Sequence, residues 1–169
     1  MWARVMLVSF FASAFAISAL TAGEIPQSKS DDAEKARQLA EEKHERAFVA
    51  LIASCQRMLD LQSQIHSGTQ KLHEIIEGHP DKTPHPEDER AALKLSASVK
   101  ECVKEVDKAL DIMAKESALA FPELFEELRK DMNRVQRCLE MSDVGAETLA
   151  LERDIIDTIN EMLKALKKG

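Results

Sequence analysis

The segment FVALIASCQRMLDLQSQIHSGTQKLHEII, residues 48–76, decides the fold class of this chain. Its apolar and neutral residues recur at steps of three and four, the spacing of one face of an α-helix. The stripe keeps its phase across Gly68, so we expect a weak point in the helix there and not a break. Upstream, Asp31 and Glu34 have the spacing of a capping box, which predicts a helix over about 31–77. The stripe consists of Phe48, Leu51, Ile52, Cys55, Met58, Leu59, Gln62, Ile65, Thr69, Leu72 and Ile76.

Three further helices are predicted after this one. The segment GHPDKTPHP, residues 78–86, contains three prolines and cannot be helical. Apolar stripes then predict helices over about 87–116, 122–140 and 146–167, with Pro122 in the first turn of its helix. We therefore expect an all-α fold of four unequal helices. The first two would form a long antiparallel hairpin and the last two a shorter pair, in an elongated bundle with coiled-coil packing.

The first 23 residues have the pattern of an export signal. Arg4 precedes an apolar run from Val5 to Leu20, and small residues end at Gly23. Sixteen apolar residues would rise only about 24 Å as a helix, which is less than the roughly 30 Å core of a bilayer. We therefore expect cleavage and a periplasmic or extracellular bacterial protein without stable membrane insertion. Residues 24–30 are predicted to be a flexible linker, and residues 31–169 a single helical domain.

Composition excludes several classes of partner. Without the predicted signal the chain has 22 Lys and Arg against 30 Asp and Glu, a net charge of −8. This charge argues against nucleic acid or an anionic membrane surface as a partner, because both need a basic face on the protein. The same part of the chain keeps only Phe48, Phe121 and Phe125 as aromatic residues, with no Trp and no Tyr. Pockets for sugars, bases or flat cofactors usually have aromatic walls, so we expect no cofactor.

Histidines around the predicted turn form the best metal candidate. His73, His79 and His85 lie six residues apart, with Asp81 and Glu87 close by in the sequence. Imidazole and carboxylate groups are suitable ligands for Zn, Cu or Ni. The spacing matches no closed structural site, however, so we read this segment as a solvated loop with incidental histidines and expect no bound metal; the three histidines are the candidates for the alternative reading, a metal site.

The chain has three cysteines, Cys55, Cys102 and Cys138. In an exported protein an odd number suggests one disulfide and a free thiol, or a covalent dimer. Cys55 and Cys102 lie in the stripes of helices that we expect to be neighbours, so they are the candidate disulfide pair. The reading that we favour over this disulfide is that the thiols are reduced and buried as small apolar groups.

No arrangement of residues in the sequence predicts catalysis. The acidic residues near the C-terminus read as a solvated helix face, because no cleft or sugar-stacking group accompanies them. No serine lies in a nucleophile-elbow motif, and no histidine flanks a cysteine. We therefore expect that the protein is not an enzyme. The acidic residues in question are Glu152, Asp154, Asp157 and Glu161.

Several segments resemble a family of secreted, all-helical bacterial proteins with no assigned function. They are QSQIHSGTQKLHEII (62–76), EVDKALDIM (105–113), AFPELFEELRKDMNRV (120–135) and DVGAETLALERDIIDTINEMLKAL (143–166). The tightest likeness covers residues 120–166. The resemblance implies export and a helical fold and supplies no catalytic residues. Outside the stripes it includes the polar residues Asp131, Thr148 and Asp154, which could cap or cross-link helices.

These observations favour an exported, non-catalytic protein that acts through protein–protein or self-association. Long amphipathic helices without pocket chemistry are suited to side-by-side packing with a protein partner or a second copy. The alternative is a periplasmic metal-binding or stress-sensing helical protein that uses the histidine-rich segment 73–87.

Overall fold

The computed structural model describes residues 27–115 and 122–168, and their side chains from residue 32 onward. The predicted signal peptide, residues 1–23, lies outside the described residues. Residues 27–36 and residues 37–169 belong to two separate units, and the arrangement of helices below concerns the second unit.

Four helices account for most of the described chain. They are α1 (Gln27–Glu77), α2 (Pro86–Lys115), α3 (Pro122–Glu140) and α4 (Ala146–Leu166), and the described ranges contain no strand. The predicted all-α fold of four unequal helices is therefore confirmed. Only the start of α1 differs by more than one residue, because the helix begins directly after Pro26. Residues 27–30 are thus helical and not linker, and Asp31 lies inside the helix and not at its cap.

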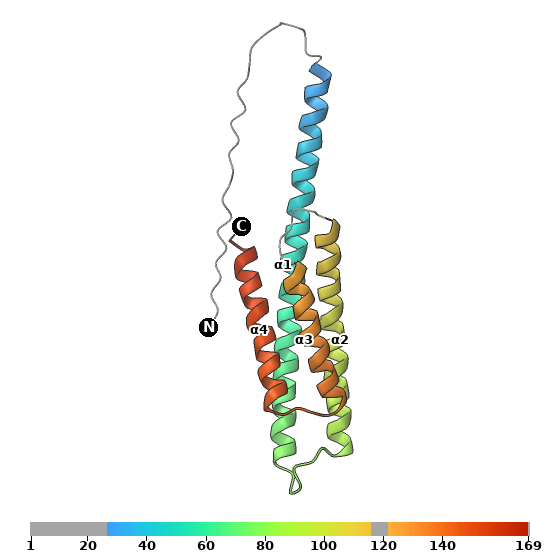
Figure 1. Cartoon of the computed structure of the whole chain (residues 1–169), viewed down its shortest axis with the longest axis vertical. Helices are drawn as coiled ribbons and strands as arrows, with labels where there is room; N and C mark the ends of the chain where they lie inside the picture. The colour runs from blue at the N-terminus through green and yellow to red at the C-terminus, as the bar shows by residue number, and fades with distance from the viewer. Residues whose placement is uncertain (1–26, 116–121, 169) are drawn as a thin grey trace. The chain divides into compact units, whose positions relative to one another are not determined.

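Within residues 37–169 the helices run alternately up and down (Figure 1). The turn of residues 78–85 joins α1 to α2, and α3 and α4 lie along this hairpin. Hydrogen bonds between charged side chains connect neighbouring helices. Arg57 Nε on α1 donates to Glu105 Oε2 on α2 at 2.9 Å. Arg129 Nη1 on α3 donates to Asp107 Oδ1 on α2 at 3.0 Å.

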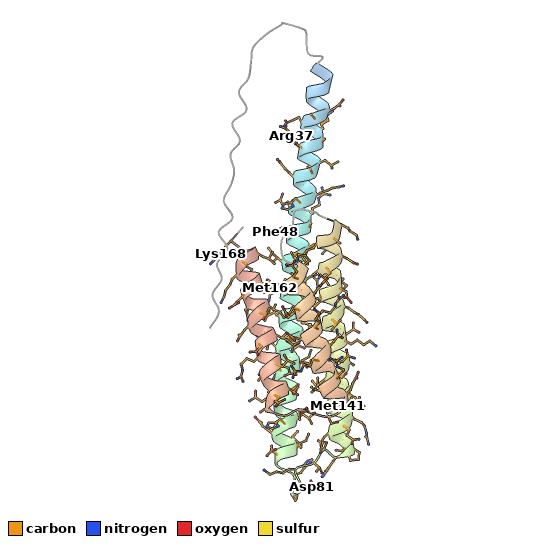
Figure 2. All side chains as sticks on the ribbon, viewed as in Figure 1. Arg37, Phe48, Asp81, Met141, Met162 and Lys168 are labelled. Atoms are coloured by element: carbon orange, nitrogen blue, oxygen red, sulfur yellow. The ribbon has the colours of Figure 1, made fainter. Side chains whose placement is uncertain are left out.

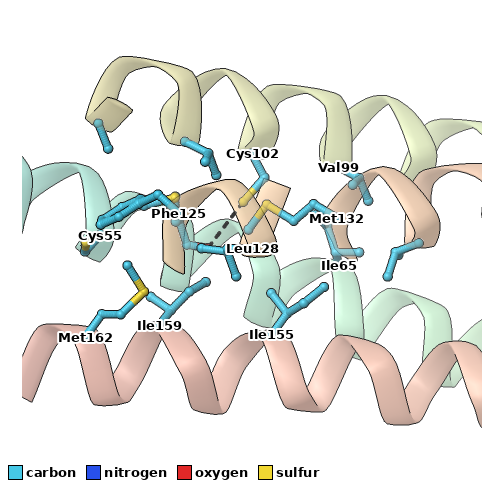
Figure 3. Packing of buried hydrophobic residues seen from close by; sticks show 14 of the residues in the cluster. Cys55, Ile65, Val99, Cys102, Phe125, Leu128, Met132, Ile155, Ile159 and Met162 are labelled. Atoms are coloured by element: carbon cyan, nitrogen blue, oxygen red, sulfur yellow. Dashed lines mark hydrogen bonds between the residues drawn. The ribbon is translucent and has the colours of Figure 1, made fainter. Parts of the chain in front are cut away.

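The core is built from aliphatic and sulfur-containing side chains, as the stripes predict. Figure 3 shows side chains from all four helices meeting around Met132, which is fully buried. Phe125 is the largest fully buried side chain among the described residues. Full burial of such a side chain stabilises the fold by roughly 1.5–3 kcal/mol. The other central members are Leu51, Met58, Ile65, Val99, Val106, Leu139, Ile155 and Ile159.

Gly68 lies where α1 and α2 approach each other closely. The helix continues through it, which confirms the prediction of no break. A Cβ at this position would lie only 2.6 Å from Leu95 Cδ2 on α2. Glycine therefore gives Leu95 room to pack directly against the α1 backbone.

The short connection between α3 and α4 is fixed by its own side chains. Ser142 has a φ of 55°, and the backbone N–H of Gly145 donates to Asp143 Oδ1 at 3.1 Å. Thr148, 2 % exposed, donates its hydroxyl to the Asp143 carbonyl at 3.0 Å. Thr148 thus holds the first turn of α4 to the preceding turn, although α4 has no side-chain cap hydrogen bond at its N-cap, Gly145.

Candidate functional site

The turn between α1 and α2 brings several metal-ligating side chains together. Its backbone is closed by a hydrogen bond from Lys82 N to His79 O at 3.1 Å, and Lys82 has a left-handed φ of 53°. Pro80, Pro84 and Pro86 fix the chain direction on either side. The result is a short loop whose histidine rings face each other. The rings of His79 and His85 are stacked, with centroids 3.9 Å apart and planes 20° from parallel.

His79 is held in one orientation by the backbone. Its Nδ1 lies 3.0 Å from the carbonyl oxygen of Thr83. Because a carbonyl only accepts, Nδ1 must carry the hydrogen in this contact. The other ring nitrogen, Nε2, then keeps its lone pair in the neutral imidazole, and a lone pair of this kind is what a metal ion binds.

Asp81 is oriented by the same threonine. The Thr83 hydroxyl donates to Asp81 Oδ2 at 2.8 Å and the Thr83 backbone N–H donates to Oδ1 at 3.3 Å. These two bonds, led by the one from the hydroxyl, lower the pKa of the Asp81 carboxyl and favour its ionised form. Asp81 Oδ1 also lies 3.6 Å from His85 Nε2. His79, Asp81 and His85 each offer one ligand atom within 4.8 Å of the other two.

Asp88 supports this loop from the first turn of α2. Its Oδ2 accepts the backbone N–H of His85 at 2.8 Å, which is the reach-back contact of a helix cap. The same oxygen lies 3.6 Å from His79 Nδ1. Asp88 therefore links the cap of α2 to the buried edge of the His79 ring. The sequence analysis missed this residue, although its position three residues after His85 is a capping signal.

The structure brings together two of the three predicted histidine ligands. His73 lies on α1 and is not part of the cluster found in the described residues, and Glu87 is also outside it. Asp81 takes the third position. The reason is geometric: His79 and His85 flank one loop, whereas His73 lies nearly two helical turns before it.

A second polar cluster is buried inside the bundle. Glu152 on α4 is 0 % exposed. Its Oε1 accepts the Thr69 hydroxyl at 2.8 Å, and its Oε2 lies 3.0 Å from Nδ1 of His66, both from α1. Burial raises the pKa of the Glu152 carboxyl, although the contacts with Thr69 and His66 favour the charged form. The prediction of a solvated face is therefore wrong for Glu152, while Asp154, Asp157 and Glu161 are exposed as expected.

Gln62, one helical turn before His66, adds to the polar character of the α1 inner face. It is 0 % exposed, and neither amide atom has a hydrogen-bond partner in the described part of the chain. A buried amide without partners costs roughly 1–3 kcal/mol.

The spacing of the apolar stripe on α4 is the sequence signal that could have predicted the burial of Glu152. Thr148 and Glu152 continue the 4-3-4 spacing of Ile155, Ile159 and Met162 toward the helix start.

The three cysteines are free thiols in the structure. Cys102 Sγ lies 3.6 Å from the Met58 carbonyl oxygen, the contact drawn in Figure 3, and it is not bonded to Cys55. The suggested disulfide between Cys55 and Cys102 is therefore absent, and both act as small buried core residues. Burial raises the pKa of Cys55 to about 11 and, with a further contribution from Glu105, that of Cys102 to about 12. Neither thiol has the features of a nucleophile.

An apolar pocket of about 200 Å³ lies between α1, α3 and α4. Leu51, Phe125 and Met162 form its floor, and Thr158 and Glu161 are the polar residues on its wall. The pocket contains no histidine or cysteine. Its mostly apolar lining is suited to an apolar group.

None of the helices in the described ranges is long and apolar enough to cross a bilayer. No family model, curated protein or solved structure matches this chain. The resemblance to secreted helical proteins thus remains a prediction, and function has to be inferred from the chemistry and surfaces of the chain.

Proposed function

We propose that this is an exported, non-catalytic protein that self-associates through α1 between Arg37 and Val49. The observation that carries the proposal is an exposed helical segment. Its apolar and charged residues are spaced so that they can pair with the same residues of a second copy. Residues 37–46 are all exposed. In Figure 2 the part of α1 between Arg37 and Phe48 lies beyond the ends of α2 and α4.

This segment carries two of the large exposed apolar side chains of the molecule. Leu39 is 56 % exposed and Val49 is 60 % exposed. Glu42 and Arg46 lie between them, and the steps of 3, 4 and 3 place all four residues on one face of the helix. Beyond its backbone hydrogen bonds, an exposed helix gains only small contributions from pairs such as Arg46–Glu42, about 0.2–0.5 kcal/mol each. Covering this face would stabilise it further.

The same face pairs with itself when two helices run antiparallel. In the register centred on residue 44, Leu39 lies opposite Val49 of the second copy. Glu42 lies opposite Arg46 of the second copy, and twofold symmetry repeats both contacts. Residues 37–46 contain three basic and three acidic residues, whereas the whole chain has a net charge of −7. The Lys, Arg, Asp and Glu charges of this segment cancel, so charge repulsion between two copies is low there. These features favour a second copy as the partner.

Sedimentation velocity on protein purified after expression of the full chain tests the proposal. The wild type should shift from monomer to dimer as concentration rises. Glu42→Arg and Arg46→Glu should each weaken the dimer, because like charges then face each other. The double variant should restore it, since the pair is only inverted. Leu93→Lys, which removes an exposed apolar residue from α2 (52 % exposed), is the matched control. A wild type that stays monomeric, or single variants that associate normally, would overturn the proposal.

Export is tested separately on the same purified protein. Mass spectrometry should show loss of about residues 1–23. Trp2 is the single tryptophan of a chain without tyrosine, so the processed protein should absorb almost no light near 280 nm. Retention of Trp2 would contradict export with cleavage and would leave the self-association result unaffected.

A further inference from the structure

The geometry points to a zinc-binding site at the α1–α2 turn, with His79, Asp81 and His85 as the protein ligands. This inference goes beyond self-association and uses residues in the turn that follows α1, away from the 37–49 segment. The observation behind it is the approach of two imidazoles and one carboxylate to within 4.8 Å of one another.

The separation of these atoms is close to what a zinc ion requires. Zinc binds nitrogen and carboxylate oxygen at about 2.0–2.2 Å, so tetrahedral ligands lie about 3.4 Å apart. Asp81 Oδ1 and His85 Nε2, 3.6 Å apart, are already close to this value. Since all three groups lie within 4.8 Å of one another, no pair has to close by more than about 1.4 Å. Asp81 already has the orientation that Thr83 gives it, and the His85 side chain is 50 % exposed. His85 has to rotate out of its stack on His79, because the lone pair of each imidazole lies in the plane of its ring. His79 is more enclosed, at 18 %, and acts as the fixed ligand.

The groups behind the ligands already have the arrangement that metal sites use. A metal-ligating histidine usually donates its second ring N–H to a carbonyl or carboxylate. His79 does so toward the Thr83 carbonyl at 3.0 Å, which leaves Nε2 for the ion. Thr83 also donates to Asp81 at 2.8 Å and orients that carboxylate. One residue thus positions two of the three ligands, and both bonds exist without the ion.

The donor set selects the class of metal. Two imidazole nitrogens and one carboxylate suit Zn²⁺, Cu²⁺ and Ni²⁺, whereas Ca²⁺ and Mg²⁺ prefer sites made of oxygen. Three protein ligands leave one coordination position for water. Asp88 is not in the cluster of ligand atoms, and its Oδ2 accepts the His85 backbone N–H at 2.8 Å. Binding would join the end of α1 to the cap of α2.

Titration calorimetry with zinc chloride tests this site on protein purified without an affinity tag and treated with chelator. The wild type should bind one zinc ion per chain and give no heat with magnesium chloride. His79→Ala, His85→Ala and Asp81→Asn should each weaken zinc binding at least about tenfold. His73→Ala is the matched control, because it removes a histidine outside the cluster, and it should bind like the wild type. Far-ultraviolet circular dichroism checks that each variant is folded.

Three results would overturn the inference. They are a wild type that binds no zinc, ligand variants that bind as tightly as the wild type, and one zinc ion per two chains. The last result would place the ion between copies and not within one turn. Loss of binding in His73→Ala equal to that in His79→Ala would also contradict the assignment of Asp81 as the third ligand. Glu42→Arg should bind zinc normally, so a failed dimer and a failed metal site give different results.

Discussion

Replacing Glu152 by glutamine should change how the stability of the protein depends on pH. The glutamine side chain keeps the size of the original and an oxygen that can accept the Thr69 hydroxyl, which lies 2.8 Å from Oε1 in the wild type. The substitution removes the titrating group that is buried at 0 % exposure. The variant therefore separates the effect of the proton from the effect of packing.

The sign follows from the raised pKa of the Glu152 carboxyl, which burial causes. Below the ordinary value of 4.5 the group is protonated in both the folded and the unfolded chain, and it contributes no pH dependence. As the pH rises above that value the unfolded chain releases the proton and the folded chain retains it. The free energy of unfolding then falls, by at most about 1.4 kcal/mol per pH unit for one proton. The fall ends once the pH exceeds the raised pKa of the folded protein.

Urea unfolding followed by far-ultraviolet circular dichroism measures this effect at a series of pH values from about 4 to about 8. The difference in unfolding free energy, wild type minus Glu152→Gln, should decrease as the pH rises. Glu161→Gln on the exposed face of the same helix is the control and should give a constant difference. A difference for Glu152→Gln that is constant, or that increases with pH, would refute the reasoning.

Three other substitutions and reactions have expected outcomes. Gly68→Ala should change the unfolding free energy by less than about 1 kcal/mol, because better helix propensity offsets the displacement of the Leu95 methyl that would lie 2.6 Å from the new Cβ. A urea-measured loss above about 3 kcal/mol would show that Leu95 cannot move. Asp88→Ala should cost about 1 kcal/mol in the same assay through loss of the cap on His85 N–H, and an unchanged midpoint would contradict that role. A thiol reagent should modify only the half-buried Cys138 in the native protein, and Cys55 and Cys102 only after unfolding. Modification of all three thiols in the native protein would contradict this.

The helices could be predicted from the sequence because their signals are local. Stripes at steps of three and four, Pro122 and the prolines of the 78–86 segment placed nearly every helix end within one residue. The start of α1 could not be placed in this way. Asp31 and Glu34 have capping spacing, but nothing in residues 27–30 stops a helix from beginning earlier.

The polar clusters could be predicted only in part, because their contacts join residues far apart in the sequence. His66 and Glu152 are 86 residues apart and meet only when α1 packs beside α4. The metal-site prediction found His79 and His85 and named His73 as a third ligand where the loop supplies Asp81. The spacing of the histidines alone cannot show which side chains the loop brings together. The hydrogen bonds of Thr83 to His79 and Asp81 determine the orientation of these two side chains.

The unpaired amide of Gln62 implies that the thermal stability of this bundle is lower than the same fold could have with an apolar residue at this position. A leucine has a similar size and would fill the same buried space without an amide nitrogen and oxygen that lack hydrogen-bond partners. Natural sequences commonly retain such residues, because selection removes only variants whose stability falls below what function requires. Position 62 is thus the first place to modify when a sturdier version of the protein is wanted as a scaffold.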